Sequence, residues 1–594
     1  MNNIVTKIRE ILIKNKNMVL VFMASLTYYV ICMLNSLKAY DVCSWIIYFG
    51  LIILYLKTDV FSKKMQKESI TLAILFSFII VFGGIAYKLM DNRELSLFRQ
   101  LLTIKNLIDF FGIFNLLFII LKNVLVYLYD FILKKTTSKI NKERIVFALS
   151  FAIIFISWIP YFLAFYPGTI TPDSMEELTT IINNFTNISD HHPVIHTLFV
   201  ALPYKIGFKF FGNVIAAVAT STIFQMTTLA SIFSSLIVFL HKRKVNDYIL
   251  LIIVLYYSLI PVHGYYSIVM WKDVMFAGTL LLLTMETIKI IEKEEKLQFN
   301  SVVSFIIVSI FCVFFRNNAI YMYIILAFAS LIIFKKHIKI FGVAFFIVFS
   351  IYLVIKKPVF NYLNITKSSS AEYIGMPLQQ VGRMAFKNVK FTEDEKELIN
   401  ELMPLEVMAV SYNPRLSDGI KFNENYNGAI FDNNKLEYLK LYLKLVYEHP
   451  SVALESYAIS TLGYWYPGVE YWSVTSSIIE NNYGLEMHSK LPENAKKVIT
   501  KLESRELPIV NIEWSIGFCF WIILIFGVIS AEKNKIKGVY PFVPIFGIWL
   551  TMMIASPVFA EFRYIYGAYT CLPLLLLSPY IISNECSKKI IAKL

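Results

Sequence analysis

The sequence predicts an all-α polytopic membrane protein with about fourteen spans and a mainly helical domain outside the membrane. Of its 594 residues, 57% are hydrophobic and only 16% are charged. Long apolar segments recur along the chain, and short stretches rich in lysine and arginine separate them. Helices of this length cross roughly 30 Å of hydrocarbon, so a soluble core does not account for the pattern.

The predicted spans follow the apolar segments in chain order. They cover residues 18–37, 43–56, 69–90, 107–130, 145–166, 212–240, 247–266, 272–291, 301–316, 319–334, 340–356, 511–530, 539–556 and 564–583. No small-residue cleavage site follows the first one, so we expect a retained anchor. The apolar block 194–211 is broken by Pro203 and carries two lysines. We expect this block to lie in the membrane interface without crossing.

Basic residues set the predicted orientation. They gather in the loops 134–144, 241–244, 335–339 and 533–537. The positive-inside rule assigns these loops and both termini to the cytoplasm of a multi-pass cell-membrane protein. The formal net charge of +14 then reflects topology, and nucleic acid is not an expected partner.

Four segments follow from this topology. Residues 1–144 form a transmembrane region of unassigned role. Residues 145–356 form a transmembrane core with a first outer loop at 167–193. Residues 357–510 form an extracytoplasmic domain, and residues 511–594 form the C-terminal spans. In the third segment, polar helix-forming runs predict helices over 392–403 and 435–447. None of the six cysteines lies in 357–510, which argues against a disulfide framework.

The loop 166–193 holds the strongest chemical signal, with the sequence YPGTITPDSMEELTTIINNFTNISDHHP. Ionisable groups are costly near lipid, so their concentration here indicates function. We take Asp173, Glu176 and Asp190 as catalytic candidates. A structural alternative stays open, because Asp173 and Glu176 also fit a capping box at a helix N-terminus.

Other polar groups lie at span ends on the same predicted outer face. The substrate-binding candidates are His191, His192, Lys272, Asp273, Arg316, Asn317, Arg563 and Tyr564. Each has a simpler explanation as well. Lysine and arginine at span ends commonly anchor a helix in the interface, and Asn317 fits a tight turn.

These motifs carry a resemblance. A span ending in Tyr-Pro-Gly, then Asp173 with Glu176 and Glu177, then His191-His192-Pro193, resembles the first outer loop of GT-C glycosyltransferases, nearest the protein mannosyltransferase and aminoarabinose transferase branch. The chain also resembles uncharacterised bacterial polytopic proteins that share PDS, HHP and WKD signatures. It departs from the GT-C pattern at Pro193-Val194-Ile195, where a His-Pro-Pro or Pro-Pro-Leu-like turn often leads into the following helix.

The resemblance implies a GT-C-like bundle that transfers a sugar from a polyprenyl-phosphate donor to a cell-envelope polymer, lipid or protein, with an extracytoplasmic active site. Asp173 matches the family's loop acid, and the Arg563-Tyr564 pair resembles a late Arg-Tyr element. Asp173 would then be the general base, and Arg563 the first choice for the phosphate. In the outer domain, Gln379, Gln380 and Arg383 are expected acceptor contacts.

Several questions stay open from the sequence. A divalent ion, Mg²⁺ or Mn²⁺, is a candidate cofactor, with Asp173, Asp190 and His191 as candidate ligands. The aromatic cluster 464–472 fits either sugar stacking or anchoring at the interface. The alternative functions are a transporter or flippase of lipid-linked or anionic envelope precursors, and a noncatalytic envelope assembly protein.

Overall fold

The computed structural model describes residues 14–133, 142–366, 374–503 and 514–591, except residues 39, 187 and 557. Within these ranges the regular elements are helices, and backbone pairing between extended segments is confined to isolated bridges. Residues 134–141 of the predicted basic loop 134–144 and residues 511–513 of the predicted span 511–530 lie outside the described residues. The contacts divide the chain into two units, which are described separately.

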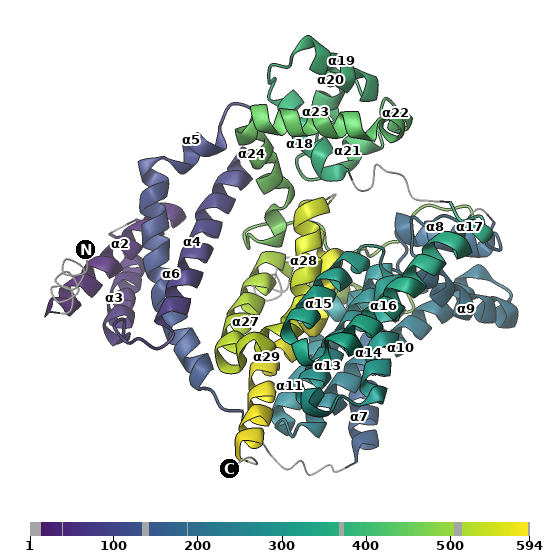
Figure 1. The fold of residues 1–594 in the computed structure, drawn as a ribbon, viewed down its shortest axis with the longest axis horizontal. Coiled ribbons are helices and arrows are strands. Elements are labelled where there is room, and N and C mark those ends of the chain that lie inside the picture. The colour runs from purple at the N-terminus through teal and green to yellow at the C-terminus, as the bar shows by residue number, and fades with distance from the viewer. Residues whose placement is uncertain are drawn as a thin grey trace. The chain divides into compact units, whose positions relative to one another are not determined.

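The first unit comprises Met1–Phe131, Gly375–Val469 and Pro557–Phe559, purple and green in Figure 1. Its N-terminal helices are α2 (Lys16–Asn35), α3 (Val42–Lys57), α4 (Gln66–Leu89), α5 (Leu97–Leu101) and α6 (Ile104–Asp130). Its later helices are α18 (Gly375–Phe386), α19 (Glu393–Leu402), α20 (Leu405–Ser411), α21 (Asp418–Lys421), α22 (Gly428–Asn433), α23 (Lys435–Glu448) and α24 (Pro450–Ser460). The helices predicted at 392–403 and 435–447 are therefore confirmed as α19 and α23, and a capping box at Thr392 starts α19.

The second unit comprises Ile132–Ile374, Glu470–Ser556 and Ala560–Leu594. Its first helices are α7 (Glu143–Ala164), α8 (Pro172–Ile182), α9 (Val194–Phe211), α10 (Val214–Lys242), α11 (Asp247–Leu259), α12 (Pro261–Ile268), α13 (Lys272–Lys293) and α14 (Phe299–Phe315). The others are α15 (Ala319–Ile333), α16 (Ile338–Val354), α17 (Phe360–Tyr362), α25 (Glu493–Glu503), α27 (Ile516–Val539), α28 (Val543–Ala555) and α29 (Phe562–Ile591). The predicted segment 357–510 is thus shared between the units, because 375–469 packs with the N-terminal helices and 470–503 with the second unit.

Ten helical stretches of the described chain are long and apolar enough to cross a membrane, or eleven if the bent pair α11 and α12 forms one span. This is compatible with a multi-pass membrane protein. Each predicted span is mainly helical over its described residues, but α3, α14 and α15 have only 16, 17 and 15 residues. The count of fourteen therefore stays a prediction. So does the interfacial placement of α9, since this 18-residue helix is among the ten.

Ion pairs between helix ends show which helix ends of the second unit lie together. Lys242, at the C-terminus of α10, lies 2.9 Å from Glu143 at the start of α7. Arg243 donates to Glu292 near the C-terminus of α13 at 2.6 Å, and Lys537 pairs with Glu294. The start of α7 and the ends of α10 and α13 therefore share one end of the unit. The loop that follows α7 and the start of α13 lie at the other.

A buried ion pair joins the later helices of the first unit to α4. Arg383 of α18 lies 2.6 Å from Glu455 of α24, and their side chains are 0% and 1% exposed. Arg383 also donates to the backbone oxygens of Leu89 and Met90, where the carbonyls at the end of α4 have no intrahelical partner. The N-terminal spans thus serve as a packing partner for the helices of 375–469.

The expected acceptor contacts of this region are wrong. Gln379, Gln380 and Arg383 are all buried. Gln379 and Gln380 donate to the backbone oxygens of Asn413 and Ala453, each at 2.9 Å. These side chains satisfy polar backbone groups inside the first unit, where an unpaired carbonyl is costly.

We predict that Arg383→Met lowers the free energy of unfolding by about 3 kcal/mol, because, among the described residues, Glu455 keeps only Lys387 as an ion-pair partner and three backbone carbonyls at or just after the end of α4 lose a donor. Unfolding of the purified protein in mixed micelles measures this. Arg415→Met is the matched control, since Arg415 pairs with Asp91 at side-chain exposures of 37% and 67%. That change should cost at most about 1 kcal/mol. Equal effects of the two substitutions would contradict the assignment.

Candidate functional site

The chain leaving α7 is held by backbone pairing before α8 begins. Gly168 has a φ of +133°, and a Cβ added there would lie 2.6 Å from Thr222 Oγ1 and 2.9 Å from the Ile268 oxygen. Only glycine fits this conformation and this space. The next two residues donate from their backbone N–H groups to Ile268 and Ser477, each at 3.1 Å. Loop 166–171 is thereby fixed against the segment that leads into α13.

Two side-chain contacts then lock α8 to the start of α13. Trp271 Nε1 donates to Thr171 Oγ1 at 2.8 Å, and Ser174 Oγ donates to the Met270 oxygen at 2.8 Å. Thr171 is the N-cap of α8, and its side chain accepts from the Ser174 N–H. The capping alternative for Asp173 is therefore wrong. Asp173 lies in the first turn of α8, where the helix dipole favours its charge and its side chain is available for other contacts.

Asp173 forms the centre of an ion cluster. Its carboxylate accepts a hydrogen bond from Arg563 Nη1 at 2.7 Å and lies 3.7 Å from Lys272 Nζ. Burial by itself raises the pKa of Asp173, but the positive charges of Arg563 and Lys272 outweigh it and hold the pKa well below its usual range. Three residues far apart in the sequence thus meet, as the sequence predicts for a shared site.

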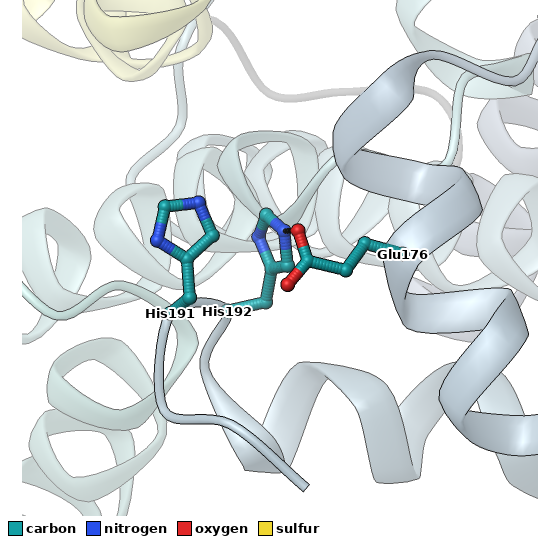
Figure 2. Close-up of side chains that lie close together, drawn as sticks. All are labelled: Glu176, His191 and His192. Carbon is teal, nitrogen blue, oxygen red and sulfur yellow. Dashed lines mark hydrogen bonds and ion pairs between the residues drawn. The ribbon is translucent and has the colours of Figure 1, made fainter. Parts of the chain in front are cut away.

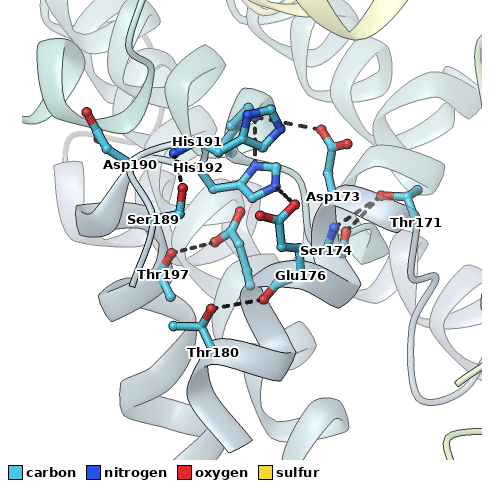
Figure 3. Close-up of polar contacts among 12 residues, drawn as sticks. Thr171, Asp173, Ser174, Glu176, Thr180, Ser189, Asp190, His191, His192 and Thr197 are labelled. Atoms are coloured by element: carbon cyan, nitrogen blue, oxygen red, sulfur yellow. Dashed lines mark hydrogen bonds and ion pairs between the residues drawn. The ribbon is translucent and has the colours of Figure 1, made fainter. Parts of the chain in front are cut away.

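His192 links this cluster to Glu176. Lys272 Nζ lies 2.9 Å from His192 Nδ1, and His192 Nε2 lies 3.0 Å from Glu176 Oε2, the contact drawn in Figure 3. An ammonium group can only donate, so Nδ1 accepts and Nε2 carries the hydrogen that Glu176 receives. The hydrogen bond from His192 lowers the pKa of Glu176.

A second, nearly fully buried ion pair lies beside the first. Arg316 Nε is 3.3 Å from Asp273 Oδ1, with side-chain exposures of 5% and 0%. Arg316 Nη1 also donates to the Tyr564 backbone oxygen at 2.9 Å. The Tyr564 ring lies 4.8 Å from the Arg316 guanidinium and 5.2 Å from that of Arg563. Arg316 therefore does more than mark a turn, because it joins the α14–α15 connection to the starts of α13 and α29.

Asp190 is held in a separate polar contact. Lys356 Nζ donates to its two carboxylate oxygens at 2.6 and 2.8 Å, and Asn317 Nδ2 donates to its backbone oxygen at 2.9 Å. Burial raises the pKa of Asp190, although Lys356 acts in the opposite direction. Asp190 thus fixes the loop immediately before His191, and it does not join the Asp173 cluster in the described contacts. Its predicted catalytic role stays a prediction.

Three polar partners in this region are not predicted from the sequence. Lys356 is one; its only signal is a lysine near the end of a predicted span. The others form a buried group beneath α8, in which His196 Nδ1 lies 2.7 Å from Glu177 Oε2 and Thr197 Oγ1 donates to the same oxygen at 3.1 Å. His196 lies in the first turn of α9, and a histidine in this mainly apolar block is the signal that could have shown it.

Among the described residues, one group of three side chains could bind a metal ion. Glu176, His191 and His192 each offer one ligand atom, and these atoms lie within 4.8 Å of one another (Figure 2). Of the three predicted ligands only His191 belongs to it, because Asp173 and Asp190 are paired with Arg563 and Lys356. Two imidazoles and a carboxylate suit Zn²⁺, whereas Mg²⁺ and Mn²⁺ favour oxygen ligands. The residues present therefore fit the expected Mg²⁺ or Mn²⁺ poorly.

A family model described as "Family of unknown function (DUF6020)" matches residues 181–589. The chain belongs to this family. The matched region contains Lys272, Arg316 and Arg563, whereas Asp173 and Glu176 precede it. No curated protein and no solved structure matches the chain.

Glu561 is a further carboxylate beside Arg563. Its side chain is 5% exposed, and Oε1 lies 3.4 Å from Arg563 Nε. Burial raises the pKa of Glu561 to about 7, although Arg563 acts in the opposite direction. The nearby carboxylates Asp273 and Asp173 raise it further. In this member of the DUF6020 family, a carboxyl group that changes charge near neutral pH thus lies beside the Arg563 guanidinium, which stays charged.

We predict that Glu561 makes stability depend on pH between its ordinary value of 4.5 and about 7. In this window the folded state binds the proton more tightly than the unfolded state, so the free energy of unfolding falls as pH rises. Glu561→Gln removes this term. Unfolding midpoints from about pH 5 to 8 should therefore fall more steeply for the wild type than for the variant.

The exposed Glu143 provides the control, because Glu143→Gln removes a carboxylate from a solvent-screened pair with Lys242 at the other end of the unit. Its curve should run parallel to the wild type. Parallel curves for the wild type and Glu561→Gln would contradict the raised pKa.

Proposed function

We propose that the protein is an integral membrane glycosyltransferase of GT-C type that acts outside the cytoplasmic membrane. The donor is a sugar linked to polyprenyl phosphate, and the acceptor is a hydroxyl of a cell-envelope polymer, lipid or protein. The observation that carries the proposal is the contact of Asp173 with both Arg563 and Lys272. It supplies a carboxylate for proton transfer and two cations for a phosphate within one cluster.

The backbone around the cluster also favours an anion. Asp173 lies in the first turn of α8, Lys272 opens α13 and Arg563 lies in the first turn of α29. Helix N-termini present unpaired N–H groups and the positive end of the helix dipole. Three such ends together with two cations are suited to a phosphate group.

The resting ion pairs suggest how substrate binding activates the base. While Arg563 and Lys272 contact Asp173, its pKa is low and it is a weak proton acceptor. A donor phosphate competes for the same two cations, because its negative charge and its two unesterified oxygens can accept charge-assisted hydrogen bonds from both. Asp173 then loses stabilising charge, and its basicity rises at the moment the donor is bound.

In the reaction, the acceptor oxygen forms a bond to the anomeric carbon as the bond from that carbon to the phosphate oxygen breaks. Asp173 takes the proton from the acceptor hydroxyl, and the electron pair of the broken bond leaves with the polyprenyl phosphate. Arg563 and Lys272 stabilise the negative charge that develops on the departing phosphate. Attack from the face opposite the leaving group inverts the anomeric carbon.

An aromatic surface for a sugar ring lies near the same cluster. The Trp472 ring is 5.7 Å from the Trp271 ring, and Arg563 lies 5.3 Å from Trp271. Trp271 is buried, whereas Trp472 is 45% exposed. Exposed indole faces stack on apolar faces of sugars, so Trp472 is our candidate for a ring contact.

We predict that Asp173→Asn lowers kcat for sugar transfer by roughly 10²- to 10⁴-fold, with donor KM changed far less, because the amide cannot accept the proton. The assay uses full-length protein in lipid nanodiscs with a panel of radiolabelled polyprenyl-phosphate sugars and envelope acceptors. Glu143→Gln is the matched carboxylate control and should retain full activity.

Full activity of Asp173→Asn would eliminate Asp173 as the base. If a folded wild type transferred no sugar from any donor but moved labelled lipid between leaflets, the flippase alternative would replace the enzyme. A folded wild type that neither transferred sugar nor moved lipid would favour the noncatalytic assembly protein.

We predict a different kinetic effect for Arg563→Gln. Loss of one charge-assisted contact to the phosphate should raise the donor KM by roughly 10- to 100-fold. Arg243→Gln, which removes the arginine paired with Glu292 at the other end of the unit, is the control. A fall in kcat alone, with an unchanged donor KM, would assign Arg563 to positioning Asp173 and not to the phosphate.

A further inference from the structure

We propose that Glu176, His191 and His192 form a binding site for a divalent transition-metal ion of the Zn²⁺ class. The proposal stands independently of glycosyl transfer, because it rests on the ligand geometry alone. The three ligand atoms lie within 4.8 Å of one another (Figure 2). Two imidazole nitrogens and one carboxylate oxygen are the ligand set found in open zinc sites.

Only small movements would close the site around an ion. Ligand atoms about 2.0 to 2.1 Å from a tetrahedral Zn²⁺ lie about 3.3 Å from one another. His192 Nε2 and Glu176 Oε2 are already 3.0 Å apart. The Glu176 side chain is 53% exposed, so it can change its conformation without disturbing the core.

The backbone that carries the ligands is fixed from both sides. The loop with His191 and His192 follows Asp190, which Lys356 and Asn317 hold through three hydrogen bonds. The helix with Glu176 is capped by Thr171, which Trp271 holds. Ligands on fixed backbone lose little conformational entropy on binding, which favours affinity.

A cavity beside two of the ligands provides room for a fourth. This cavity of about 290 Å³ is lined by Glu176 and His192 together with Thr180, Asn183 and Ser189. This is space for water or for a substrate hydroxyl. Three protein ligands beside an open position are typical of catalytic zinc sites, whereas structural sites use four protein ligands.

Lys272 competes with the metal for His192. An imidazole whose Nε2 binds a metal keeps its hydrogen on Nδ1 and donates it to an acceptor. The Lys272 ammonium cannot accept, so metal binding and the observed contact of 2.9 Å exclude each other. Asp173, 3.7 Å from Lys272 Nζ, is the partner available to the displaced lysine. Removing the Lys272 charge should therefore strengthen metal binding.

The test measures metal binding to full-length protein in nanodiscs after treatment with a chelator. Equilibrium dialysis against buffered Zn²⁺ with elemental analysis should give one ion per chain, and Co²⁺ should give the visible absorption of a four-coordinate site. His191→Ala, His192→Ala and Glu176→Gln should each weaken binding at least tenfold, and Lys272→Met should strengthen it roughly tenfold. His488→Ala, which removes an exposed histidine of the same unit, should leave binding unchanged.

Monodisperse elution and an unchanged helical circular dichroism spectrum identify the variants that fold. Glu176→Gln keeps the test decisive if a histidine variant does not fold, because the Glu176 side chain is exposed. The proposal is overturned if the folded wild type binds no Zn²⁺, or if binding survives Glu176→Gln unchanged. It is also overturned if Lys272→Met weakens binding. A preference for Mg²⁺ over Zn²⁺ would overturn the assigned ion class.

Discussion

The arrangement of the second unit depends on the compensation of charge around Asp173. Carboxylates and cations are costly to bury, and a group that loses its partner costs several kcal/mol, roughly 3 to 5. Asp173 contacts Arg563 and Lys272, and Asp273 contacts Arg316. These five residues come from four parts of the chain, so the pairs also fix where the helices that carry them begin. Each buried charge is stable because the fold places an opposite charge beside it.

The pairing between loops makes this compensation possible. Gly168 allows loop 166–171 to pass close to Thr222 and Ile268, and Thr171 then accepts from Trp271. Asp173 is two residues past Thr171 and Lys272 is one past Trp271, so the two charged side chains are brought together by backbone geometry. A carboxylate fixed in this way reorganises little when charge develops nearby, which suits the role that we propose for Asp173. The same contacts hold Glu176 and His192 at hydrogen-bonding distance.

The first unit applies the same principle to packing. Arg383 and Glu455 are buried as a pair, and Arg383 also satisfies carbonyls at the end of α4. From the sequence, an arginine with two neighbouring glutamines outside the membrane looks like a polymer-binding surface. The structure turns all three side chains inward, because the helices of 375–469 pack against one another and against α4. Burial against distant segments leaves no local signal, and this explains the error.

The sequence by itself determined the class of protein and most members of the candidate site. Apolar segments fix where helices form, and costly polar residues between them mark Asp173, Glu176, His191, His192, Lys272, Arg316 and Arg563, since little other than function or pairing retains such groups near lipid. Only the tertiary structure decided how these groups are paired. It separated Asp190 from Asp173, made Thr171 the cap of α8, and brought Glu176 to His192 and Lys356 to Asp190. Ion pairs and hydrogen bonds act over a few ångströms between residues up to several hundred positions apart, so the fold alone selects them.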